Sequence, residues 1–541
     1  IITKNPSENT FKLGYNLSII NKNTEDKVMF GNASVISKKK NSGATFFINN
    51  RKRGWYDHNG DNFSELPKLR DNTFGTTLFI LPSKNQKIEA SLSSIYEYRY
   101  GGEMISQAAH LSMQAEERVH NVILGNLDYQ INSNDGSSSF MAYLAAQQTD
   151  RTHYTGIRPE TSSNEDLIHL KNPPYGTSLN NTSQIGFQFN HKIDKYLGPN
   201  IFTLGSEFIT DDVVDKIPAF NYLIDQNIET KSVFFQSDWD LTENLNIVSG
   251  ARIDNHSLLD NIVFSPRVSF LYKLKEQTQF RLSYSTGFRA PQAIDTDLHI
   301  AFSGGGISRI IIDDNLRQEK SKSLSASINY DKATVEYVYG FTIEGFYTTL
   351  EDAFYQEPNG NDSFGDIFIK KNGAGAIVKG LTIELRANLK RKLQLESGFT
   401  FQQSLYNEAV KYSDNLPLIR EFLRSPNCYG YSNITFNANK YISLSLNLLH
   451  TGSMNILHLS GAPNQLEDEL LLSPIFNSIS FKTTYSKELK AYGLKIEYSL
   501  GVKNITNDYQ QEFDSFKNRD SNFIYGPSLP RTIYCGIVLK Y

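Results

Sequence analysis

Apolar and polar residues alternate along most of this chain with a period of two. In residues 11–19 every odd position is apolar and every even position is small, polar or charged, and residues 494–500 alternate in the same way. This periodicity is typical of β-strands with one apolar face. About 22 such segments can be counted, each longer than the roughly 9 to 11 residues that a tilted strand needs to cross a bilayer. The pattern predicts an all-β fold, a transmembrane antiparallel β-barrel of about 22 strands that forms one domain over residues 1–541.

The connections between these segments alternate between short turns and long polar loops. Short turns lie at 82–85 and 275–276, whereas long loops are predicted at 150–181, 211–226 and 287–320, among others. In an antiparallel meander this order places every long loop at one end of the sheet and every turn at the other, with both termini on the turn side. Outer-membrane barrels have this asymmetry.

A soluble propeller or solenoid would also show alternating strands. No motif recurs in this sequence at the period of roughly 40 to 50 residues that propeller blades require. The last segment, residues 533–541, alternates up to a terminal aromatic residue, Tyr541. Outer-membrane barrels commonly end in this way, so the chain end favours the membrane barrel over the soluble alternatives.

Composition excludes several other classes of protein. Lys and Arg number 54 and Asp and Glu 58, and this net charge of −4 does not fit a nucleic-acid-binding protein. The two cysteines lack zinc-site spacing, and no apolar run approaches the roughly 20 residues of a transmembrane helix. We find no nucleophile elbow, phosphate loop or HExxH motif, so we expect neither an enzyme nor a cofactor.

Two neighbouring motifs carry a family resemblance. Residues 284–291 read YSTGFRAP and residues 315–321 read NLRQEKS. They resemble the GFRAP and NPNLxPEKS boxes of TonB-dependent outer-membrane receptors, although Asp313-Asp314 stands where the family often has Asn-Pro. The chain end, from 502–507 to 530–532, is similar to the NLFN…GxPR ending of the same receptors. The box residues are Phe288, Arg289, Ala290, Pro291, Asn315, Leu316 and Glu319.

The resemblance implies a receptor and channel in the outer membrane of a Gram-negative cell that takes up a scarce nutrient by TonB-dependent active transport. It implies partners: a plug domain in the barrel lumen, the TonB–ExbB–ExbD complex acting through that plug, and lipopolysaccharide or other outer-membrane lipid. Runs at 96–103 and 519–527 look like those of Bacteroidota receptors, which often carry a surface lipoprotein. Plug sequence is missing before the first strand, and we expect the plug to be cleaved, omitted or supplied by a separate chain.

For the ligand, the resemblance favours a metal chelate, meaning a ferric siderophore, haem or cobalamin. Two alternatives from other classes are a passive porin and a structural barrel within an outer-membrane assembly. Aromatic, histidine and arginine side chains in the long loops are suited to stacking on a flat macrocycle or pairing with an anionic chelate. Ordinary loop composition is the competing interpretation for the whole set. These ligand-binding candidates are Trp55, Tyr56, Tyr100, His110, Tyr154, Arg158, His299 and Arg309, with His299 as an iron ligand if the nutrient is haem.

Overall fold

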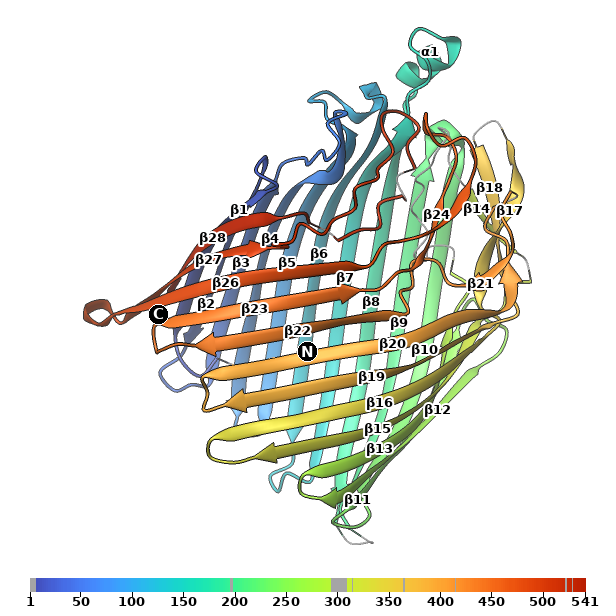
Figure 1. Ribbon diagram of the computed structural model, residues 1–541. Coiled ribbons are helices and arrows are strands. Elements are labelled where there is room, and N and C mark those ends of the chain that lie inside the picture. Colours follow the sequence, from blue (N-terminus) through green and yellow to red (C-terminus); the bar gives the residue numbers. More distant parts are fainter. Residues whose placement is uncertain are drawn as a thin grey trace.

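The chain forms a closed antiparallel barrel of long strands (Figure 1). The computed structural model describes residues 6–194, 198–292, 309–313, 315–362, 365–413, 415–520, 523–527 and 529–541. The first half of the barrel wall is built from β1 (Thr10–Ile20), β2 (Thr24–Ile36), β3 (Ser42–Arg53), β4 (Phe63–Ser83), β5 (Gln86–Glu103), β6 (Gln114–Asn132), β7 (Ser138–Ile157), β8 (Tyr175–Ile193), β9 (Asn200–Ile217), β10 (Tyr222–Asp240) and β11 (Leu245–His256).

The second half is built from β12 (Val263–Lys275), β13 (Thr278–Arg289), β15 (Glu319–Ala333), β16 (Tyr337–Glu351), β19 (Ala376–Leu389), β20 (Leu393–Val410), β22 (Cys428–Asn437), β23 (Ile442–Thr451), β26 (Phe476–Leu489), β27 (Leu494–Lys503) and β28 (Thr532–Lys540). Each strand pairs with its neighbour along the chain, and β1 pairs with both β2 and β28. This last pairing closes the sheet into a barrel. The predicted 22-strand barrel is confirmed.

The long connections all leave the wall at one end, here called the loop end. They carry short elements of their own: η1 (Ala109–Leu111), α1 (Asn164–Lys171), η2 (Pro218–Phe220), β14 (Arg309–Ile312), β17 (Phe354–Asp362), β18 (Gly365–Asn372), β21 (Ile419–Glu421), β24 (Asn455–His458) and β25 (Glu469–Leu472). The opposite end, the turn end, has short turns and η3 (Lys490–Tyr492). Among the described helices, none is long and apolar enough to span a bilayer.

One predicted loop is wrong. Residues 211–226 form mostly strand, because β9 continues to Ile217 and β10 starts at Tyr222, with only the η2 turn between them. Asn221, in the left-handed conformation (φ 48°), reverses the chain there. The prediction failed because the apolar residues here come in adjacent pairs, Val213-Val214 and Leu223-Ile224, so the alternation that marks a strand is interrupted.

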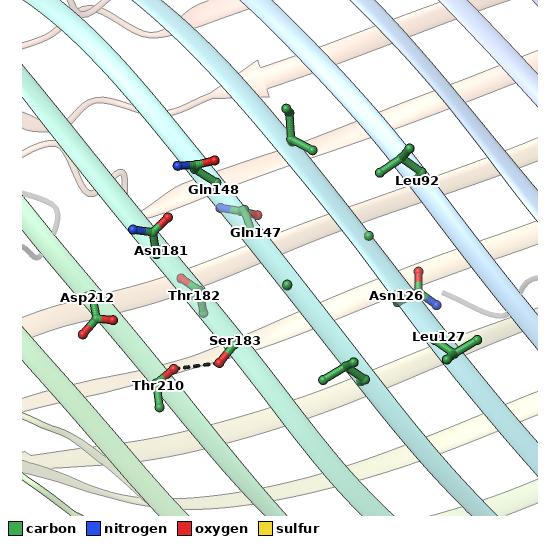
Figure 2. A pocket seen from close by; sticks show the side chains of 14 residues that line it. Leu92, Asn126, Leu127, Gln147, Gln148, Asn181, Thr182, Ser183, Thr210 and Asp212 are labelled. Atoms are coloured by element: carbon green, nitrogen blue, oxygen red, sulfur yellow. Dashed lines mark hydrogen bonds between the residues drawn. The ribbon is translucent and has the colours of Figure 1, made fainter.

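Apolar side chains lie on the outward face of β5, β6 and β7 (Figure 2). Leu92, Ile123, Leu127 and Leu144 are about half exposed there and surround a shallow depression floored by Gly125 and Ala146. Across β8 and β9 the same face changes to polar side chains, including a hydrogen bond of 2.7 Å between Ser183 and Thr210. An apolar outward band that ends in a polar border is the surface expected of a barrel in a membrane.

The inward face is polar, as the alternation requires. Arg252 on β11 lies 2.8 Å from the carboxylates of both Glu207 and Asp254, and the hydroxyl of Ser232 donates a 2.6 Å hydrogen bond to Asp254. Polar groups of this kind are satisfied within the wall through ion pairs and hydrogen bonds. The inward surface is therefore built to face water or a polar partner.

Candidate functional site

The loop between β27 and β28, residues 504–531, links several other loops at the loop end of the barrel. It forms hydrogen bonds or ion pairs with four other loops, which follow strands on both sides of β27 and β28 in the barrel. These contacts are Asn59 Nδ2 to Ser515 Oγ at 3.2 Å, Phe516 N to Asp61 Oδ2 at 2.7 Å, Lys517 to Glu160 at 3.1 Å, Arg424 to the Ile524 carbonyl at 3.1 Å and His458 to Asp514 at 2.9 Å. We call this segment the final loop.

Arg519 anchors the final loop to the inward side of β4. Its guanidinium lies 3.0 Å from Glu65 and donates a 2.6 Å hydrogen bond to the Ser64 carbonyl. Both charged side chains are buried, Glu65 completely. Gln114 at the start of β6 donates to the Arg519 carbonyl at 3.2 Å. A buried pair that loses one partner leaves an uncompensated charge, so these contacts strongly favour the docked position of the final loop.

An inner aromatic cluster lies under the same loop. Tyr56 and Tyr509 are buried with Ile20, and their rings meet edge to face with centroids 6.3 Å apart. The Tyr56 hydroxyl is 2.9 Å from Nδ1 of His58, whose ring packs against Tyr509 and Phe513. Burial lowers the pKa of His58 below its usual value near 6.5. The cluster therefore favours a neutral His58, and the Tyr56 ring is committed to packing.

An outer aromatic cluster lies on the opposite face of the wall, against η1. Tyr100 and Tyr154 are almost completely buried, together with Ala109 and Ala115. Trp55 packs edge-on against Tyr100, at 5.9 Å between centroids. Alternation places these tyrosines on the same face as the apolar band, so the cluster fixes loop 104–113 to the outside of the strands. Their rings are enclosed here and not open for stacking on a ligand.

The two other described candidates, His110 and Arg158, hold the loop that contains α1. Arg158 forms a bidentate pair with Asp166, at 2.6 and 3.0 Å, and holds the pKa of that carboxyl at about 2. Ser163 caps the helix by accepting a 3.0 Å hydrogen bond from the Asp166 amide. Nδ1 of His110 lies 3.0 Å from the Tyr175 hydroxyl. Both candidates thus already have protein partners.

The two family boxes meet where β13 and β15 leave the wall. Arg289 is directly opposite Glu319, and their side chains approach to 3.3 Å. The guanidinium also lies 4.7 Å from the centre of the Phe354 ring, while Ala290 and Pro291 are buried beside the pair. Phe288 precedes Arg289 in β13, and Asn315 and Leu316 form the turn that enters β15. These contacts hold the base of the loop between the boxes.

His299 lies outside the described residues, and for Arg309 only the backbone, in β14, is described. Among the described residues, no group of three or more His, Cys, Asp or Glu side chains is arranged to hold a metal ion.

Sequence reasoning missed a row of cations on the inward face at the loop end. Arg53 lies on β3, and Arg99 and Arg118 lie directly opposite each other on β5 and β6. Arg99 is about half exposed to the lumen and pairs with Glu97 at 2.8 Å, and Arg118 pairs with Glu116. The alternation in the sequence does place these arginines on the inward face. Only the strand register, however, brings Arg99 and Arg118 opposite each other. We call Arg53, Arg99 and Arg118 the inner basic row.

Solved structures of siderophore and ferric-catecholate receptors share this fold. The siderophore receptor PirA from Acinetobacter baumannii is 14% identical, with a TM-score of 0.72 over 100% of this chain and 81% of that one. A point mutant of the ferric enterobactin receptor PfeA from Pseudomonas aeruginosa is 14% identical, with a TM-score of 0.75 over 100% and 81%. The ferric-catecholate import receptor Fiu of Escherichia coli K12 is 10% identical, with a TM-score of 0.73 over 99% and 82%.

Sequence comparison gives the family. The ferrienterobactin receptor of Escherichia coli (strain K12) is 22% identical over 266 residues, which are 47% of this chain and 35% of that protein. The match thus spans about a third of the relative's length. The family described as "TonB dependent receptor-like, beta-barrel" matches residues 36–422, well over half of the chain. With its closed 22-strand wall, the chain therefore belongs to the TonB-dependent receptor β-barrel family of the outer membrane.

Proposed function

We propose that this barrel is the channel and receptor part of a transporter that imports an anionic ferric siderophore through the outer membrane. The inner basic row carries the proposal. It lies on the lumen face at the loop end, where a ligand arriving from outside the cell first meets the wall. The relatives named for siderophores and enterobactin support the same class of ligand.

The juxtaposition of Arg99 and Arg118 gives this row its chemistry. Like charges that lie directly opposite on neighbouring strands destabilise a sheet unless an anion lies between or beside them. Glu97 and Glu116 neutralise part of this charge from within the same strands. From Arg53 to Arg118 the row spans three strand spacings, or about 14 Å. An anionic chelate would contact the guanidinium groups of Arg99 and Arg118, and bidentate hydrogen bonds to oxygen anions are the strongest available to arginine. Arg53, whose guanidinium donates to the Pro67 carbonyl at 2.9 Å, adds its positive charge from the end of the row.

The sequence candidates have a supporting part in this proposal. Tyr56 and His58 support the final loop from inside, whereas Tyr100, Tyr154, His110 and Arg158 hold the neighbouring loops from outside. The box residues Arg289 and Glu319 hold the base of a third loop. We propose that these contacts keep the loops in position around the entrance, and that Trp55, His299 and Arg309 belong to the same loop surface.

Energy coupling completes the proposal. A barrel of about 22 strands is too wide for its own side chains to fill, so a plug domain is proposed to occupy the lumen. TonB–ExbB–ExbD would act on that plug from the periplasm, and a surface lipoprotein would cover the loops. The polar inward face, with networks such as Glu207–Arg252–Asp254, is suited to a plug that must move.

Binding of iron-labelled ferric enterobactin to the purified full-length receptor tests the ligand class. The double variant Arg99→Gln/Arg118→Gln should raise the Kd by about 10- to 100-fold, as expected for the loss of two charge-assisted contacts. Arg281→Gln, on the inward face of β13 and far from the loop end, is the matched control and should leave the Kd unchanged. Haem and cyanocobalamin serve as competing ligands. The proposal would be contradicted if the double variant bound ferric enterobactin as tightly as the parent receptor. It would also be contradicted if the parent bound haem or cobalamin tightly but not ferric enterobactin.

A further inference from the structure

A second row of cations lies on the outward face of the same wall. Lys27 on β2 is directly opposite Lys52 on β3, and Lys52 is directly opposite Arg70 on β4. Lys52 and Arg70 are exposed, and the Lys27 side chain is 45% exposed. We call these three residues the outer basic row.

Register fixes the direction in which the row points. Lys27 shares its parity with the exposed Met29, Lys52 with Ile48, and Arg70 with Phe74. Since successive side chains of a strand point to opposite faces, all three cations project to the side that carries the apolar band. They therefore point away from the lumen, where no plug or imported ligand can reach them.

The positions below the row place it at the edge of the membrane. One step toward the turn end, the outward positions on β1 to β5 are Tyr15, Met29, Asn50, Asn72 and Tyr96. One step further they include Leu13, Ile48 and Phe74, each 39% to 48% exposed. Tyrosines between charged and apolar positions are characteristic of the girdle at the membrane–water interface. The row thus lies just above the hydrocarbon at the loop end.

The charge of the row is only partly neutralised by the protein. Glu25 lies 2.5 Å from Lys27, and this carboxylate is 57% exposed. On the other side Lys68 adds a cation, 4.4 Å from the centre of the Trp55 ring. Cα atoms on neighbouring strands are about 5 Å apart, so three cations lie within about 10 Å. Like charges at this spacing repel, and an anion bridging them would relieve the repulsion.

We propose that the outer basic row binds the phosphorylated headgroup of lipopolysaccharide in the outer leaflet, with the acyl chains on the apolar band below it. Phosphate oxygens match the arginine fork and the two ammonium groups, and clusters of basic residues at a membrane surface recognise anionic headgroups in this way. A soluble anion would satisfy the charges but gain nothing from the apolar surface beneath. The inference rests on the membrane location and does not depend on the identity of the imported ligand.

Native mass spectrometry of the full-length receptor in detergent tests the site, with purified lipid A as the probe. Lys27→Gln/Lys52→Gln/Arg70→Gln should raise the apparent Kd for phosphorylated lipid A at least tenfold. Lys231→Gln/Lys320→Gln/Lys322→Gln is the matched control, because it removes three outward cations that have acidic neighbours, and it should bind as the parent does.

Two further arms separate lipid from simple anion binding. Enzymatically dephosphorylated lipid A should bind the parent and the outer-row variant equally weakly. Inorganic phosphate at the same concentration should not displace the lipid. Unchanged lipid A binding by the outer-row variant would overturn the proposal. So would a parent receptor that binds dephosphorylated lipid A as tightly as phosphorylated lipid A. Displacement by phosphate alone would make the row a general anion site and overturn its assignment to lipid.

Discussion

The two basic rows occupy the same wall at nearly the same height but face different surroundings. Lys52 and Arg53 are consecutive residues of β3, yet one belongs to the outer row and the other to the inner row. The outer row lies above an apolar band, and the inner row lies beside the carboxylates of Glu97 and Glu116. Because a strand alternates its faces, a one-residue offset separates a surface suited to lipid from one suited to an imported ligand.

The two faces also differ in what covers them. On the inside, the final loop is tied down by a buried ion pair between Arg519 and Glu65. On the outside, η1 and its loop are held by a cluster of tyrosine rings around Tyr100 and Tyr154. Loss of one ionic partner leaves a buried charge without compensation, whereas loss of one ring leaves a cavity that neighbouring side chains can partly fill. A single substitution at the ion pair should therefore release the final loop, while the outer loop keeps its remaining ring contacts.

Removal of the Arg519 side chain should give the largest effect. Arg519→Ala leaves the Glu65 carboxylate buried without its partner, and breaking a buried pair costs about 3 to 5 kcal/mol. The docked state of the final loop should lose most of that stability. Hydrogen exchange of residues 505–520 should accelerate by at least a hundredfold, while loop 104–113 on the outside remains protected.

Lys517→Ala is the matched control, since Lys517 pairs with Glu160, a carboxylate that is 90% exposed. Exposed pairs contribute less than about 1 kcal/mol, so exchange should change only a few-fold. Comparable exchange in the two variants would show that the Arg519 pair does not hold the final loop.

Charge reversal at the two consecutive residues should separate the rows. Arg53→Glu should weaken binding of ferric enterobactin about tenfold, or roughly 1.4 kcal/mol, and leave lipid A binding intact. Lys52→Glu should do the reverse. Both affinities are measured on the same purified receptor. If either substitution lowers both affinities equally, the two faces are not independent and the comparison fails.

Acidification should loosen the docking of the final loop, because His58 packs against it and becomes protonated. Burial lowers the pKa of His58 in the folded state below its unfolded value near 6.5, so folding favours the neutral imidazole. The stability that this group contributes is complete above pH 6.5 and is lost as the pH falls from there through the folded-state pKa. The protection factors of residues 505–516, which compare each amide with its intrinsic exchange rate at the same pH, should fall several-fold between pH 7.5 and 5.5. His58→Gln should abolish this pH dependence; an undiminished dependence would assign it to another group.

The smallest effect is expected on the outside, at Lys68. Its ammonium lies 4.4 Å from the centre of the Trp55 ring, both side chains are half-buried, and such a cation–π contact is worth about 1 kcal/mol. Lys68→Met should lower the thermal midpoint of the receptor by about a degree and leave binding of ferric enterobactin unchanged. A marked loss of ligand binding would instead place Trp55 and Lys68 in the ligand site.

The fold class, the strand number and the loop asymmetry could be predicted from the sequence, because alternation and turn spacing are local properties of the chain. The boxes around Arg289 and Glu319 also indicated the family, and the β13–β15 pairing brings these two residues directly opposite each other. Residues 211–226 were misread, because their apolar residues come in neighbouring pairs and do not alternate.

Which side chains lie together could not be predicted in this way, because it depends on the folded barrel. Tyr56, Tyr100 and Tyr154 read as open loop aromatics, but the folded loops enclose them in two separate clusters. Arg99 and Arg118 are 19 residues apart in sequence, and Lys27 and Arg70 are 43 apart, so nothing local joins them. Strand register brings each pair onto one face, and register depends on pairing around the whole closed barrel.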